Sequence, residues 1–205
     1  MPRLTLEQEI ERMKLMWQFE HEYSDYEYIC GIDEVGRGPF AGPVIACAVI
    51  LPKDLDILYV NDSKKVSEKK RELLYEQITK EAIAYGVGII NQNEIDEINI
   101  LNATKKGLTI AIKELQVKPD RILVDALKNI DTCNIPYTSI IKGDAKSITI
   151  AAASVVAKVT RDRLMVEYDK IYPEYNFKSN KGYGSAVHIA ALKKYGKTPI
   201  HRNSF

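Results

Sequence analysis

Two adjacent carboxylates at the end of an apolar strand are the residues of this sequence best suited to chemistry. The segment from Ile29 to Pro43, ICGIDEVGRGPFAGP, runs from a short apolar strand into Asp33 and Glu34 and then into a stretch crowded with glycine and proline. Neighbouring residues of a strand point to opposite faces, so the two carboxylates converge only if the strand ends or bends where the glycines allow it. An isolated Asp-Glu pair is more often an acidic surface turn, so this pair needs support from elsewhere in the chain.

Two further strand ends carry acids. The apolar run 122–125 ends in Asp125, and the run 140–144 places Asp144 after a glycine turn. Either aspartate alone could equally well be a helix cap. Four carboxylates at the strand ends of one sheet repel one another, however, unless a cation neutralises them. The pattern therefore predicts a cation site at these strand ends.

The implied cation is Mg²⁺ or Mn²⁺, because no His or Cys accompanies the acids to favour zinc. Two such ions would activate a water and stabilise the leaving oxygen of a phosphodiester. A dinucleotide site is disfavoured, because Gly36, Gly38 and Gly42 miss the G-x-G-x-x-G spacing by one residue. The histidines are not placed for a metal cluster, and only His188, five residues after Tyr183, is a candidate for lying near a site.

The overall charge is nearly balanced, with 29 Lys and Arg against 28 Asp and Glu, but it is unevenly distributed. Residues 142–205 carry 12 basic and 5 acidic side chains, a net of +7, which leaves −6 for residues 1–141. This polarity favours a phosphate-bearing partner, although a solvated basic face would give the same count. The basic residues that follow the acidic positions are Lys142, Lys146, Lys158 and Arg161.

Two loops are candidates for contacts with nucleic acid. Lys178 and Lys181 precede Gly182-Tyr183-Gly184, a flexible loop that would present an aromatic ring. Lys64 and Lys65 lie in a polar loop and could meet phosphate.

The periodicity of hydrophobic residues, together with the glycines and prolines that separate the periodic segments, predicts an α/β fold. Strands are expected over 28–33, 44–51, 85–90, 121–125 and 137–141, and helices over 5–21, 67–82, 94–98, 101–115, 147–171 and 186–194. This order argues for a mixed five-stranded sheet flanked by helices rather than an all-parallel doubly wound sheet.

No repeat or low-complexity linker divides the chain. We treat residues 1–27 as an N-terminal helical extension and residues 28–205 as one catalytic domain that includes a helical C-terminal region from about residue 173. No run of about 18 apolar residues suggests a membrane span, and the charged N-terminus does not look like a signal peptide. The three cysteines suit a reducing compartment. We therefore expect a cytoplasmic protein, and nothing in the sequence demands more than a monomer.

At six places the chain resembles the ribonuclease HII family, and the resemblance covers nearly everything after Tyr28. The matching segments are Gly31-Ile32-Asp33-Glu34-Val35-Gly36-Arg37-Gly38-Pro39, Asn61-Asp62-Ser63-Lys64-Lys65, Val124-Asp125 with Lys142-Gly143-Asp144, Ala151 to Asp162, Lys181-Gly182-Tyr183-Gly184 and His201-Arg202-Asn203-Ser204-Phe205. The sister family, ribonuclease HIII, has a glutamate at the fourth acidic position and no arginine between the two glycines. Asp144 and Arg37 therefore favour HII.

The resemblance implies a ribonuclease H-like fold and hydrolysis of the RNA strand of RNA/DNA hybrids, including a cut 5′ of a single ribonucleotide in duplex DNA that leaves a 3′-hydroxyl and a 5′-phosphate. It implies roles in ribonucleotide and primer removal during replication and repair. The four metal-binding acids implied by position are Asp33, Glu34, Asp125 and Asp144.

The resemblance also implies how the substrate is read. The backbone of Gly36, Arg37 and Gly38 would recognise the ribose 2′-hydroxyl, and Tyr183 would stack on the next sugar and sense the RNA-to-DNA junction. Lys64 would contact phosphate. Two alternatives remain open: a nuclease of the same fold without ribose selectivity, and a non-catalytic nucleic-acid-binding module.

Overall fold

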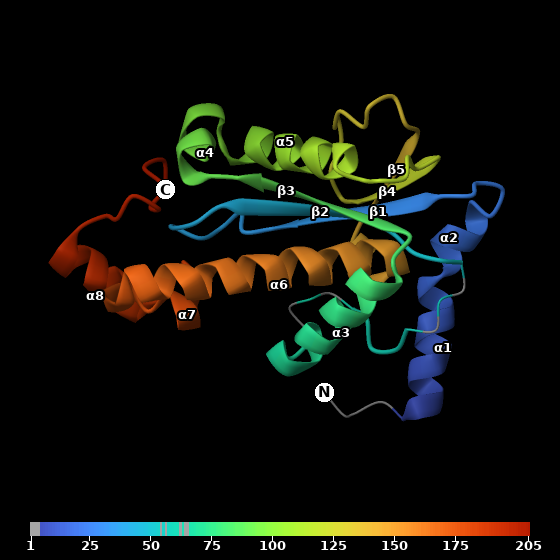
Figure 1. Cartoon of the computed structure of the whole chain (residues 1–205), viewed down its shortest axis with the longest axis horizontal. Helices are drawn as coiled ribbons and strands as arrows, with labels where there is room; N and C mark the ends of the chain where they lie inside the picture. Colours follow the sequence, from blue (N-terminus) through green and yellow to red (C-terminus); the bar gives the residue numbers. More distant parts are fainter. Residues whose placement is uncertain (1–4, 54, 56, 62, 64–65) are drawn as a thin grey trace.

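The computed structural model describes residues 5–53, 55, 57–61, 63 and 66–205. It contains one mixed five-stranded sheet, as the sequence predicts (Figure 1). The strands are β1 (Ile29–Val35), β2 (Val44–Ile50), β3 (Ala84–Ile90), β4 (Arg121–Asp125) and β5 (Tyr137–Ile140). They lie in the order β3-β2-β1-β4-β5. The first three are antiparallel neighbours, while β1, β4 and β5 run parallel.

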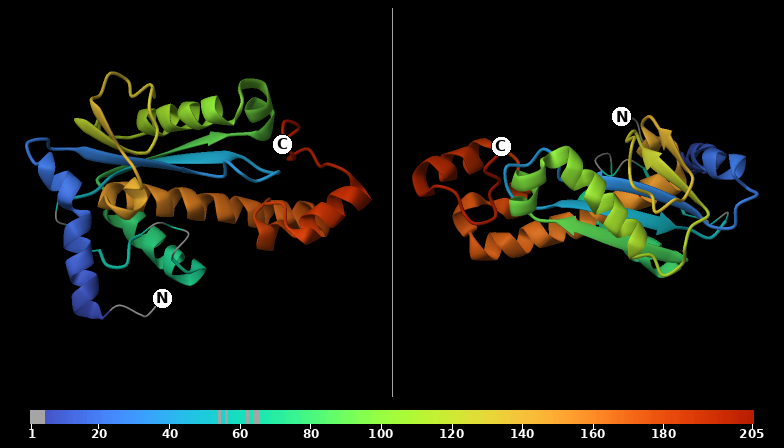
Figure 2. Two further views of the ribbon diagram at one scale, coloured as in Figure 1. Left: turned by 180° about the vertical axis from the view of Figure 1, so that it is seen from behind. Right: turned by 90° about the horizontal axis from the view of Figure 1, so that it is seen from above.

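Helices cover both faces of the sheet. On one face lies α5 (Ile100–Lys113), next to the short α4 (Gln92–Ile98). On the other face lies α6 (Ile148–Ile171), which crosses β1 and β2 and carries α3 (Glu68–Glu81) on its outer side (Figure 2). Among the described residues, no helix is long and apolar enough to cross a membrane.

The remaining helices lie at the two ends of α6. One end holds α1 (Leu6–Met16) and α2 (Gln18–Glu22), and the other holds α7 (Phe177–Asn180) and α8 (Ala186–Tyr195). Two single-turn 3₁₀ helices, Gly143–Ala145 and Pro173–Tyr175, flank α6. After α8 the chain turns back, so the C-terminus lies beside α4 and the hairpin between β1 and β2 (Figure 1).

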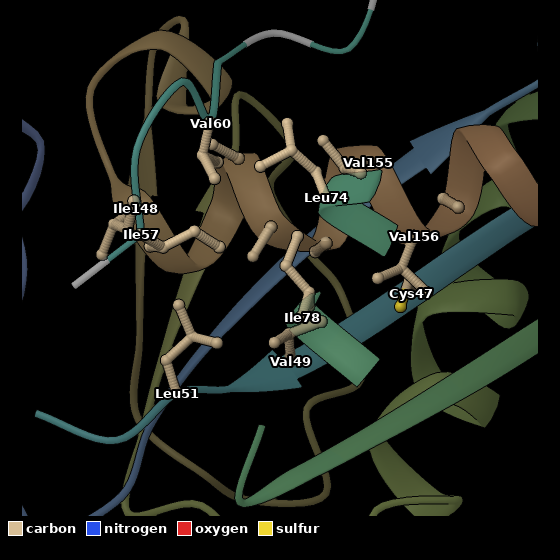
Figure 3. Packing of buried hydrophobic residues seen from close by; sticks show 14 of the residues in the cluster. Cys47, Val49, Leu51, Ile57, Val60, Leu74, Ile78, Ile148, Val155 and Val156 are labelled. Atoms are coloured by element: carbon tan, nitrogen blue, oxygen red, sulfur yellow. The ribbon is translucent and has the colours of Figure 1, made fainter. Parts of the chain in front are cut away.

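The largest hydrophobic core joins the sheet to α6 and α3 (Figure 3). Cys47 and Val49 of β2 pack there with Ile78 of α3 and Val156 of α6. Gly31 lets α6 approach β1 closely, because a Cβ at this position would lie 2.1 Å from the carbonyl carbon of Thr149. The start of α6 is therefore held directly against the strand that carries the acidic pair.

The predicted boundaries agree with the structure within one or two residues, and two of the differences have structural consequences. The expected single helix over 5–21 is broken at Trp17, whose backbone N–H bonds to the carbonyls of Lys14 and Leu15 and so ends α1. The capping box at its start is confirmed: the Gln8 N–H donates to the Thr5 hydroxyl at 3.2 Å, and the Thr5 N–H donates to the Gln8 side chain at 3.0 Å.

The second difference affects the site. Strand β1 was expected to end at Asp33, but it continues to Val35 because β2 pairs with its last residues, Asp33 opposite Cys47 and Glu34 opposite Ala46. Both acids therefore lie within the strand and not beyond its end. Alternation along the strand places Asp33 on the α6 face and Glu34 on the other, so the strand does not end where the two carboxylates were expected to converge, although the Glu34 charge still lies near enough to raise the pKa of Asp33.

Candidate active site

Parallel pairing of β1 with β4 brings two of the predicted acids together. Ile32 lies opposite Val124, so the residues that follow, Asp33 and Asp125, are neighbours on the α6 face of the sheet. Asp33 is only 6% exposed. Burial raises the pKa of the Asp33 carboxyl well above its ordinary value; the nearby charges of Glu34 and Asp125 raise it further, and a hydrogen bond from Ser154 opposes the shift.

The third strand end carries Asp144 into the same neighbourhood. After β5, Lys142 takes a left-handed conformation and the chain forms the tight turn Gly143–Ala145. The Gly143 N–H donates to Asp125 Oδ1 at 2.7 Å, so one oxygen of Asp125 holds the turn that bears Asp144. Asp125 is not the N-cap of this turn, which begins after Lys142, and Asp144 directly follows the residue that Asp125 binds.

This acidic neighbourhood suits a hard divalent cation. A buried carboxylate surrounded by like charges is costly, and a cation bound by carboxylate oxygens would relieve that cost. Within the described ranges, no three His, Cys, Asp or Glu side chains already lie close enough together to hold a metal ion.

The glycine-rich loop after β1 meets Tyr183 from the far end of the chain. Gly36 has a φ of +94°, a conformation that favours glycine. A Cβ on Gly38 would lie 3.7 Å from Cε1 of Tyr183, whose side chain is 43% exposed. Arg37 is exposed, with Nη1 3.5 Å from Oε1 of Glu34. The structure therefore places Tyr183 against the loop predicted to read the ribose.

Lys64 lies outside the described residues. Its neighbour Ser63 is described, and it accepts a hydrogen bond from the Ser154 hydroxyl at 3.0 Å. Ser154 also lies near enough to Asp33 to lower the pKa of its carboxyl, so the chain at Ser63 passes beside the acidic neighbourhood.

Two buried arginines fix the loop, and the sequence did not reveal this role. Arg161 is fully buried and donates to the carbonyls of Ala41, Pro43 and Lys181 at 2.8–3.0 Å. Burial lowers the pKa of Arg161 to about 10. The interpretation of Arg161 as part of a basic surface was wrong, because a fully buried guanidinium cannot contact phosphate.

Lys158 is also excluded from an open basic surface. Its ammonium group lies 2.6 Å from Asp162 on the next turn of α6, and its side chain is 13% exposed. By contrast, Lys142 and Lys146 are exposed.

The second buried arginine is Arg202, which is 1% exposed. It donates to the carbonyls of Gly36, Arg37 and Gly42 at 2.5–3.0 Å. Burial lowers the pKa of Arg202 to about 9. The sequence signal for this residue was the C-terminal motif, which resembled the family but suggested no contact.

A buried histidine pair supports Tyr183. Nε2 of His188 lies 2.9 Å from Nε2 of His201, and Nδ1 of His188 lies 2.9 Å from the Tyr183 carbonyl oxygen. His188 therefore lies next to the candidate site residue, as its spacing in the sequence suggested.

Comparison with solved structures assigns the class. The ribonuclease H2 of Pyrococcus horikoshii OT3 is 29% identical, with a TM-score of 0.71 over 87% of this chain and 93% of that chain. Bst-RNase HIII, solved in complex with Mn²⁺, is 15% identical, with a TM-score of 0.62 over 82% of this chain and 63% of that chain. The fold is thus that of the ribonuclease H-like class.

Sequence comparison gives the family. The ribonuclease HII family model matches residues 30–205. A curated ribonuclease HII from Lachnoclostridium phytofermentans is 62% identical over 194 residues, which cover 95% of this chain and 76% of the relative. The chain belongs to the ribonuclease HII family. It is accordingly an endoribonuclease, of a family that hydrolyses the RNA strand of RNA/DNA hybrids.

Proposed function

We propose that this protein nicks duplex DNA on the 5′ side of a single embedded ribonucleotide, besides hydrolysing the RNA strand of hybrids. The products are a 3′-hydroxyl and a 5′-phosphate. The observation that carries the proposal is the approach of Tyr183 to the loop Gly36–Gly38, which directly follows the strand that bears the buried Asp33; the half-buried Asp125 lies on the adjacent strand. This arrangement supports a substrate whose sugar is read at the loop while its phosphate meets the carboxylates.

Asp33, Glu34, Asp125 and Asp144 would hold two divalent ions, Mg²⁺ or Mn²⁺. When bound, such ions activate a water and stabilise the departing 3′-oxygen of a phosphodiester. The chain's own contribution begins with the fixed positions of these acids: Asp33 is buried within β1, and Asp125 accepts the Gly143 N–H at 2.7 Å. Fixed carboxylates need little reorganisation during the reaction.

The substrate is read by neighbouring groups. Backbone amides of Gly36, Arg37 and Gly38 would contact the 2′-hydroxyl, which distinguishes RNA from DNA. The exposed Tyr183 ring would stack on the following sugar. Lys64 would contact phosphate. We propose that the enzyme acts as a monomer, with residues 1–27 as a helical extension of the catalytic domain 28–205, and serves ribonucleotide and primer removal in replication and repair.

The test compares three duplexes: DNA with one ribonucleotide, DNA alone, and a continuous RNA/DNA hybrid, each with Mg²⁺, Mn²⁺ or a chelator. We expect a single metal-dependent nick 5′ of the ribonucleotide, cleavage of the hybrid, and intact DNA. Cleavage of the hybrid alone would refute the junction-reading role of Tyr183. Cleavage of all three duplexes would instead favour a nuclease without ribose selectivity.

The variant Asp125→Asn separates catalysis from binding. We expect it to bind the ribonucleotide-containing duplex without cutting it, since the amide keeps the size of the side chain but loses the charge. Unchanged cleavage would remove Asp125 from the mechanism. A wild-type protein that bound but never cut would favour the non-catalytic binding module.

A further inference from the structure

The C-terminal segment, residues 200–204, contacts both elements proposed to read the substrate. The Gly42 N–H donates to the Ile200 carbonyl at 2.9 Å, and the Arg202 N–H donates to the Phe40 carbonyl at 2.8 Å. His201 forms a β-bridge with Ala41. The segment is therefore bonded along the loop that links β1 to β2.

Arg202 determines how the glycine-rich loop presents its amides. Its guanidinium holds the carbonyl of Gly36 at 2.5 Å and that of Arg37 at 2.9 Å. A peptide unit is planar, and in the trans form its N–H points opposite to its C=O. There is no cis peptide among the described residues. Fixing these two carbonyls on the buried side therefore aims the N–H groups of Arg37 and Gly38 away from Arg202.

His201, the neighbour of Arg202, is linked to Tyr183 through His188. Nδ1 of His201 accepts the Thr198 N–H at 2.8 Å, which places the ring hydrogen on Nε2. That hydrogen is donated to Nε2 of His188, and His188 in turn donates from Nδ1 to the Tyr183 carbonyl. Each ring is neutral in this chain of bonds. Two consecutive residues thus hold the ribose-reading loop and the backbone of Tyr183.

The segment itself is anchored at the surface by α4. Asp96 accepts hydrogen bonds from the N–H groups of Asn203 and Ser204, at 2.7 and 2.9 Å, and from the Ser204 hydroxyl at 2.6 Å. These bonds lie outside the buried core, so they can be removed with little direct effect on it.

We propose that residues 200–204 are a positioning segment that sets the ribose-reading loop against Tyr183, with Arg202 and His201 as positioning residues and Asp96 as their anchor. The inference rests on the proposed function. A continuous hybrid has a 2′-hydroxyl on every nucleotide of its RNA strand, so the enzyme can bind it productively at many positions. A duplex with a single ribonucleotide can be bound productively at only one position. Loosening the segment should therefore impair cleavage at a single ribonucleotide more than cleavage of a hybrid.

The test measures kcat and KM on both duplexes for Arg202→Lys and Asp96→Ala. Lysine keeps the charge but cannot bond three carbonyls in a fixed fork. We expect Arg202→Lys to lower the ratio of kcat/KM on the single ribonucleotide to that on the hybrid by about tenfold or more, and Asp96→Ala by roughly threefold, because small misplacements of reacting groups are costly.

Asp120→Ala is the matched control, because this exposed aspartate also accepts a backbone N–H, that of Tyr28, at the opposite end of β1. Its ratio should equal that of the wild type. An unchanged ratio in Asp96→Ala would overturn the inference, even if Arg202→Lys failed to fold, while leaving the proposed function intact. Failure of the wild type to cut the single-ribonucleotide duplex would instead refute the proposed function.

Discussion

Replacing Asp33 with asparagine should stabilise the metal-free protein. The carboxylate is buried beside Glu34 and Asp125, and these surroundings raise its pKa, so its ionised form opposes folding. Asparagine has nearly the same volume, can still bond to Ser154 and carries no charge. Relieving one such strained functional group typically adds about 1–2 kcal/mol. For a chain of this length that corresponds to an increase in Tm of roughly 2–8 °C.

The sign of the pH dependence follows from the same shift. A carboxyl whose pKa is raised on folding does not lower the free energy of unfolding below its unfolded pKa. As the pH rises from there through the folded pKa, the buried group must ionise, and the protein loses stability. The gain from Asp33→Asn should therefore be larger at pH 8 than at pH 5.

The assay is thermal unfolding in chelator and in Mn²⁺, with the exposed Asp25→Asn as control. In chelator the variant should melt above the wild type. In Mn²⁺ the wild type should gain stability, by about 2.7 kcal/mol at one hundred times its Kd, and the variant should gain less. A variant that melts below the wild type in chelator at pH 8 would refute this reasoning.

Three further predictions concern groups that position the site. Burial, together with the nearby His188, lowers the pKa of His201 to about 4 from 6.5. The free energy of unfolding should therefore fall by up to about 3 kcal/mol as the pH drops from 6.5 to 4. Urea unfolding of His201→Gln should not show this dependence on pH. Glu20 Oε1 accepts three hydrogen bonds from Ser147 and Thr149 at the start of α6. Urea unfolding should show a loss of about 2–4 kcal/mol for Glu20→Ala and clearly less for Glu20→Gln, which keeps an acceptor oxygen. Equal losses in the two variants would contradict this role. Gly31→Ala should cost about 3 kcal/mol or more in the same assay, because its Cβ would collide with the backbone of α6, and a loss below about 1 kcal/mol would show that the helix can move away.

Local patterns in the sequence were enough to predict the strands and most helices. The apolar runs that became β2 and β4 are short and bounded by turn residues, and Pro173 marks the end of α6 as expected. Acids at the ends of neighbouring strands also predicted that Asp33 and Asp125 would approach each other. The strand and helix predictions depend on residues close together in the chain, whereas the approach of Asp33 to Asp125 followed from the expectation that their strands belong to one sheet.

Contacts between distant segments were not predictable in this way. Arginine usually lies at the surface, but Arg161 is buried because it donates hydrogen bonds to the carbonyls of Ala41 and Pro43 in the loop after β1. The hydrogen bond from the Arg202 guanidinium to the Gly36 carbonyl joins residues 166 positions apart, and no hydrophobic periodicity predicts that contact. The extension of β1 to Val35 likewise depends on pairing with β2.

Mn²⁺ binding measured by electron paramagnetic resonance, without nucleic acid, tests the central claim most directly, namely that the acids of the three strand ends form a divalent metal site. We expect saturable binding by the wild type and by Asp120→Asn, and at least roughly tenfold weaker binding by Asp125→Asn, since loss of one charged ligand removes a large part of the attraction. Equal Mn²⁺ affinity in the wild type and in Asp125→Asn would contradict the account.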